Sequence, residues 1–193
     1  NGKHLVTFES RNEWESLPQT LDIDINDNPY SQHIGDHAFF THESAAYTFS
    51  IKGITASLEG GLKGYLRSMN SELPDIPEEL PGITENVIHT NSFTVYATPR
   101  LEYWYKRVNI SLNLPVSYAH YSFDKAIANH NEAYFSPSLT FNWQPNNRFS
   151  SMLRGGIGRS PMNLNLIHPG LIMTNYRTLK SGVNDFYNSS SQN

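Results

Sequence analysis

Cysteine is absent from this 193-residue chain, and charged side chains are scarce. The lack of cysteine excludes disulfides, thiolate nucleophiles, Cys-ligated zinc and iron–sulfur clusters. Charged residues make up 17%, below the usual quarter, and the net charge of −4 provides no basic surface for nucleic acid or anionic lipid. No run approaches the roughly 18 to 20 apolar residues that a membrane-spanning helix needs. The remaining classes are soluble domains and membrane proteins that cross with strands.

Aromatic residues are abundant: 10 Phe, 3 Trp and 11 Tyr make 12% of the chain. Aromatic side chains favour β-strands over helices. The length suits one domain or a piece of a larger one, and no internal repeat divides it. We therefore expect residues 1–193 to form a single all-β unit with little helix.

Apolar residues alternate with polar ones, which is the period of a strand with one apolar face. The segments with the clearest alternation are 54–67, 93–105, 108–118, 135–143 and 149–157. Their apolar positions number 30 and include no Asp, Glu, Lys or Arg, whereas about five charges would be expected by chance. The charges lie on the opposite face: Glu59, Lys63, Arg67, Arg100, Glu102 and Arg154.

The connectors between these segments differ in length. Short connectors at Lys52-Gly53, Lys106-Arg107 and 144–148 predict tight hairpins, whereas 69–91 and 122–133 read as long polar loops. Residues 1–45 carry weaker signals, with short strands expected only near His4–Phe8 and Leu21–Ile25.

Two architectures share an apolar face opposite a polar one. These are a soluble β-sandwich or jelly roll, whose apolar face is its core, and a membrane barrel, whose apolar face meets lipid. Segments of about 11 to 13 residues exceed the usual 5 to 6 of soluble sheets and match a tilted membrane strand. Aromatic residues flank both ends of the strands, as in interfacial belts: Tyr103, Trp104, Tyr105 and Trp143 near the short connectors, and Tyr118, Tyr121 and Phe123 at the far end. We therefore predict an antiparallel up-and-down (meander) β-barrel or barrel segment.

Three stretches resemble a known family. Tyr134–Trp143, Gln144–Asn147 and His168–Leu179 resemble the barrel of TonB-dependent-receptor-like outer-membrane proteins of Bacteroidota, and residues 46–67 look like an earlier hairpin of that barrel. The resemblance covers roughly residues 46–182. It implies a barrel of 22 strands, closed by a plug and coupled to TonB, that admits large nutrients. Only eight or nine candidate strands fit in this chain, so the resemblance implies a mid-barrel portion.

The function implied by the resemblance is outer-membrane transport: the barrel portion of an importer of bulky nutrients, and no enzyme. The implied partners are outer-membrane lipid, the plug domain and TonB of the parent protein's system, and a surface lipoprotein at the long loops; nucleic acid is not among them. The six charged residues on the polar face become candidates to line the lumen. The alternative is a soluble β-sandwich binding module that recognises carbohydrate through surface aromatics.

Two stretches superficially resemble metal sites. Asp22–Asn28 begins like a calcium loop, but Asp27 and His33 occupy the positions where an EF-hand needs Gly and Glu. We expect a strand that runs into an Asx-rich turn. His33, His37 and His42, with Asp36 and Glu43, form the densest histidine cluster, which we expect to be a polar loop and not a zinc site.

No motif predicts catalysis or a cofactor. Gly155–Ser160 lacks the Lys-Ser/Thr ending of a phosphate-binding loop, and its small residues suit close approach of a neighbouring backbone. No Gly-x-Ser-x-Gly elbow occurs.

Overall fold

The fold is an antiparallel β-sheet. In the computed structural model the described residues are 2–25, 28–72, 85–124, 129–158, 171–175 and 178–181. No helix long and apolar enough to cross a membrane occurs among them. The strands are β1 (Lys3–Ser16), β2 (Gln19–Ile25), β3 (Asn28–Ile51), β4 (Ile54–Glu72), β5 (Glu85–Tyr105), β6 (Val108–Asn113), β7 (Val116–Phe123), β8 (His130–Phe135), β9 (Ser138–Asn146), β10 (Phe149–Gly156), β11 (Leu171–Asn175) and β12 (Thr178–Ser181).

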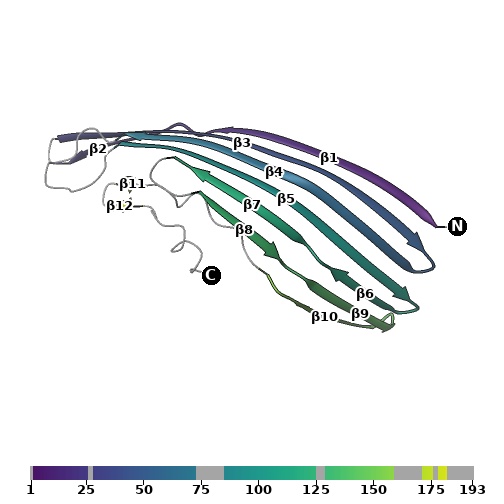
Figure 1. Cartoon of the computed structure of the whole chain (residues 1–193). Helices are drawn as coiled ribbons and strands as arrows, with labels where there is room; N and C mark the ends of the chain where they lie inside the picture. The colour runs from purple at the N-terminus through teal and green to yellow at the C-terminus, as the bar shows by residue number, and fades with distance from the viewer. Residues whose placement is uncertain are drawn as a thin grey trace.

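The first ten strands form one open meander, and β11 and β12 form a separate two-stranded sheet. Three pairs of strands lie end to end along a common neighbour: β1 and β2 along β3, β6 and β7 along β5, and β9 and β8 along β6 and β7. Figure 1 shows the long strands side by side, bending along their length, with β1 at one edge and β10 at the other. The predicted antiparallel meander is confirmed as an open barrel-like segment.

A proline interrupts each of the end-to-end pairs: Pro18, Pro115 and Pro137. Proline has no backbone N–H to give to the strand ladder, so pairing stops there. The carbonyls still accept: Ser136 N donates to Pro115 O at 3.1 Å, and Ile157 N donates to Pro137 O at 2.9 Å. Pro99 within β5 likewise accepts from Leu114 N at 2.9 Å.

Tight turns join the strands at one end of the sheet. Lys52 and Gly53 have φ values of 45° and 81°, and Lys106 has 50°. Such positive φ values belong to hairpin turns whose twist matches that of the flanking strands. The hairpins predicted at Lys52-Gly53 and Lys106-Arg107, and the β9–β10 hairpin, are confirmed.

The sheet has an outer and an inner face. The outer face carries the apolar parity of the sequence, and many of its large side chains are exposed, including Leu58 (53%) and Leu66 (52%). The inner face carries the other parity. Among the residues whose burial is described, cross-strand register places the buried hydrophobic ones on the inner face, namely Ala38, Met69, Ile88, Ala119, Tyr121 and Phe123.

Several strands are longer than the sequence predicted. The strand expected near His4–Phe8 is the 14-residue β1, and the short strand expected near Leu21–Ile25 is confirmed as the seven-residue β2. The polar loop expected around His33–Glu43 is wrong, because these residues lie in the 24-residue β3. The expected loops are shorter, because β4 continues to Glu72, β5 starts at Glu85, β7 ends at Phe123 and β8 starts at His130. Residues 73–84 and 125–128 lie outside the described part. Long polar strands pair as well as apolar ones because the ladder is made by the backbone.

We predict that Gly53→Ala destabilises the protein by about 1 kcal/mol or more. Its φ of 81° disfavours an L side chain, and a Cβ there would lie 2.4 Å from the carbonyl oxygen of Trp104. Urea unfolding followed by tryptophan fluorescence measures the effect.

Gly35→Ala is the matched control, because a Cβ at Gly35 meets nothing within 4 Å. Its unfolding midpoint should stay or rise, since alanine reduces the entropy of the unfolded chain. Equal losses for both variants would contradict the strain assigned to the turn.

Candidate functional site: the inner face

All six charged residues predicted to share a face do lie on the inner face. The register sets Glu59 opposite Thr98, Lys63 opposite Thr94, and Arg67 opposite Thr90. Arg100 and Glu102 lie on β5 opposite Asn113 and Ser111, and Arg154 on β10 lies opposite Thr140. That this face lines a lumen remains a prediction.

Two of the six meet at Tyr96, in a central cluster formed by His42, Glu59, Lys63 and Tyr96. The Tyr96 hydroxyl donates to Glu59 Oε1 at 2.8 Å and lies 2.7 Å from His42 Nε2. Because the hydroxyl gives its only hydrogen to Glu59, His42 is the donor through Nε2–H. The Lys63 ammonium lies 5.2 Å from the centre of the Tyr96 ring, a cation–π contact. Four polar groups from three strands thus hold one another.

Gly61 makes room for the central cluster. A Cβ at this position would lie 2.8 Å from the Tyr96 hydroxyl and 2.5 Å from the carbonyl oxygen of Glu43. Glycine therefore lets the tyrosine cross the strand and reach its partners on β3 and β4.

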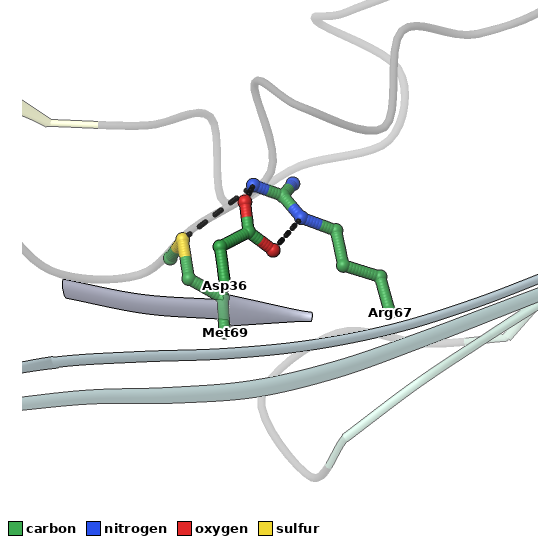
Figure 2. Close-up of polar contacts among 3 residues, drawn as sticks. All are labelled: Asp36, Arg67 and Met69. Atoms are coloured by element: carbon green, nitrogen blue, oxygen red, sulfur yellow. Dashed lines mark hydrogen bonds and ion pairs between the residues drawn. The ribbon is translucent and has the colours of Figure 1, made fainter. Parts of the chain in front are cut away.

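Arg67 belongs to a second group, nearer the other end of the sheet. Figure 2 shows its guanidinium against the Asp36 carboxylate: Nε donates to Oδ1 at 2.8 Å and Nη2 to Oδ2 at 2.7 Å. The Met69 sulfur also accepts from Nη2 at 3.7 Å. The side chains of Arg67 and Asp36 are only 13% and 20% exposed, respectively. The hydrogen bond to Asp36 raises the pKa of Arg67.

The remaining candidates stand apart from both groups. Arg100 and Glu102 pair with each other along β5. Arg154 lies on the exposed edge strand β10. The structure thus brings Glu59 and Lys63 together, pairs Arg100 with Glu102, and leaves Arg67 and Arg154 in separate places.

Sequence reasoning missed Asp36, His42 and Tyr96 as partners. A signal for the first two was present: a tight turn at Lys52-Gly53 before a long strand requires an equally long partner that ends at Ile51. Such a partner would have put even-numbered residues of 36–50 on the polar face. Tyr96 is one of several tyrosines, and its partner His42 is 54 residues away.

The members of the histidine cluster lie on opposite faces of the sheet, because successive residues of a strand alternate between the faces. His33 and His37 lie on the outer face, and His42 and Asp36 on the inner face. Within the described ranges no three His, Asp or Glu side chains gather in a way that could hold a metal ion. Asp22 lies in β2, and Asn26 and Asp27 lie outside the described residues.

The glycine stretch lies on an edge strand. Gly156 ends β10, and a Cβ there would lie 2.8 Å from Pro137 O, so the expected close backbone approach occurs at this position. A Cβ at Gly155 or Gly158 would meet nothing within 4 Å. Arg159 and Ser160 lie outside the described residues.

The inner face can hold polar and charged groups through paired cations, carboxylates and hydroxyls. A scan against protein-family models finds no match to the chain, and a search of curated proteins finds no relative.

We predict that Arg67→Ala lowers the free energy of unfolding by roughly 2 kcal/mol or more, because it leaves the nearly buried Asp36 carboxylate without its bidentate partner. Denaturant unfolding gives the value.

Arg11→Ala is the matched control, since Arg11 pairs with Glu13 on exposed β1, where the side chains are 59% and 52% exposed. It should cost less than about 1 kcal/mol. Similar costs at both sites would contradict a structural role for the Arg67–Asp36 pair.

Proposed function

We propose that the chain is the barrel portion of an outer-membrane transport protein, a TonB-dependent-receptor-like importer of bulky nutrients. The observation that carries the proposal is the exposed apolar outer face. Many large hydrophobic side chains on this face are exposed over β1 to β10, from Ile51 at 37% to Phe8 at 81%. A contiguous apolar surface of this extent is rare on a soluble monomer and needs a cover.

The height of the apolar face fits a bilayer. On β5 the outer positions are apolar from Phe93 to Tyr103, ten residues apart. At about 3.4 Å per residue this is about 34 Å, which a strand tilt of 35–45° reduces to about 24–28 Å. The apolar band of an outer-membrane barrel is about 25 Å tall. Beyond Phe93 the outer positions become polar, with Asn91 and His89.

Aromatic rings border this band at both ends. Tyr103 and Tyr105 stack near the tight turns, with ring centres 6.4 Å apart. Trp14 lies beside Phe39 at the other border. The belts differ in part from those expected.

Some aromatic residues expected in the belts lie on the inner face, because successive residues of a strand point to opposite faces. Trp104 lies on the inner face between two outer tyrosines. Tyr121 and Phe123 lie buried on the inner face, and only Tyr118 of that group faces outward.

One charged side chain lies on the described outer face within the band. Glu43 is level with Val95, near the polar border, through the β3–β4–β5 register. Its Oε1 accepts from Ser10 Oγ at 2.7 Å and Asn12 Nδ2 at 3.4 Å. These partners reduce the cost of placing a carboxylate there.

The inner face suits a water-filled passage. Its central cluster and the Arg100–Glu102 pair lie at the same levels as the apolar outer rows, an arrangement typical of a barrel whose lumen is polar. In this proposal the lumen is filled by a plug that TonB displaces, and the ends opposite the tight turns select the solute, alone or with a surface lipoprotein.

The soluble carbohydrate-binding β-sandwich is the less favoured alternative. A sandwich buries its apolar face against a second sheet. Within the described residues many outer apolar side chains are exposed, and the buried hydrophobic residues lie on the polar face. This distribution is the reverse of that in a sandwich.

We predict that Leu112→Arg blocks membrane assembly at a cost of roughly 2–4 kcal/mol. Leu112 lies on the outer face between Leu101 and Leu139, within the band. Ser111→Arg is the control, because Ser111 is its neighbour on the inner face, opposite Glu102. Heat-modifiable migration of the folded protein reports assembly, and equal tolerance of both arginines would refute the assigned faces.

The expressed protein should sediment with outer membranes, resist alkaline carbonate and dissolve in detergent, because an exposed apolar band requires acyl chains or their substitute. Immunoblots of the fractions measure this. A monomer in the detergent-free soluble fraction would rule out the transport proposal and favour the binding module.

A further inference from the structure

A pocket lies on the inner face at the tight-turn end of β5, β6, β9 and β10. Its volume is about 550 Å³, within the usual range for small-molecule sites. The register places Trp104, Asn109 and Asn142 side by side on three strands, and Gln144 follows on β9. None of these residues belongs to the charged groups described above.

The floor of the pocket contains an unsatisfied amide. Asn109 is 6% exposed, and its Oδ1 accepts from Asn142 Nδ2 at 3.0 Å. Its own Nδ2 has no hydrogen-bond partner among the described residues. A buried donor without an acceptor is costly, and the χ2 torsion of asparagine is broad enough for the amide to turn towards an entering oxygen. The floor therefore favours a ligand that carries acceptor oxygens.

The wall of the pocket offers a flat apolar surface. Trp104 is 57% exposed although it lies on the polar face. Its backbone is fixed, since its N–H donates to Gly53 O in the adjacent turn at 2.7 Å. An indole beside amides matches a pyranose ring, which presents C–H bonds on one face and hydroxyls around its rim.

The charged residues that line the pocket are both positive. Lys106 and Arg107 both line the pocket, and none of its described lining residues is an Asp or Glu. Glu102, the carboxylate nearest to Trp104 along β5, pairs with Arg100, and Lys106 Nζ lies 5.2 Å from the centre of the Tyr105 ring. The positive charge of the lining favours a ligand with a negative group.

We propose that this pocket binds a short saccharide that carries a carboxylate, of the uronic-acid type. One sugar ring stacks on Trp104, ring hydroxyls bond to the amides of Asn109, Asn142 and Gln144, and the carboxylate lies near Lys106 and Arg107. The residues given a role in binding lie on the inner face or in the Lys106-Arg107 turn, so the site can be tested independently of what covers the outer face.

The test is titration of the full-length protein in detergent with trigalacturonate and with the neutral trisaccharide maltotriose, followed by tryptophan fluorescence and by calorimetry. Trigalacturonate should bind saturably, more tightly than maltotriose, with an affinity that falls as salt rises. Trp104→Ala should weaken binding by about tenfold or more, and Gln144→Ala by a smaller factor. Both side chains are exposed, so neither change should impair folding.

Trp14→Phe is the matched control, because Trp14 lies at the far end of the sheet on the outer face and should leave the affinity unchanged. Absence of saturable binding, or equal affinity in the Trp104→Ala variant, would overturn the saccharide site. Equal binding of the two trisaccharides would overturn the role given to Lys106 and Arg107.

Discussion

The alternation of side chains along a paired strand is the constraint on which the structure depends. Because successive residues point to opposite faces, one register fixes the environment of every side chain at once. In the observed register, Leu58, Leu62 and Leu66 share the outer face while Glu59, Lys63 and Arg67 share the inner one. A slip of one residue would exchange the two sets. The tight turns prevent it: Lys52 and Gly53 fix Ile51 opposite Ile54, and Lys106 and Arg107 fix Tyr105 opposite Val108.

The strands that could be predicted are those whose apolar positions form an unbroken series. Residues 54–67 have such a series, and the tight turns beside them set the hairpins. Strand β3 could not be predicted as readily, because His33, Asp36 and Glu43 give its middle the composition of a loop. It is held by backbone pairing on both sides, with β1 or β2 on one and β4 on the other. That support comes from segments distant in the sequence, and local composition does not reveal it.

The face of each candidate residue could be predicted, but its partner could not. Parity placed Arg67 on the polar face, yet its partner Asp36 lies 31 residues away on a strand that local signals did not reveal. The predicted aromatic belts are wrong in part for a related reason, because aromatic residues close to one turn lie on both faces of the sheet. Trp104 lies between Tyr103 and Tyr105 in sequence but on the opposite face. There it lines a polar pocket, a role that a belt residue would not have.

The prolines of the sheet have a mechanical consequence. Pro99, Pro115 and Pro137 each accept a backbone hydrogen bond, from Leu114, Ser136 and Ile157 respectively, and cannot return one. Between β5 and β10 each of these prolines therefore leaves one backbone hydrogen bond of the ladder unmade. In contrast, β3 and β4 pair without a break over 19 residue pairs. The sheet is therefore more weakly paired near the three prolines than between β3 and β4, so a force that bends the sheet should bend it first at the prolines.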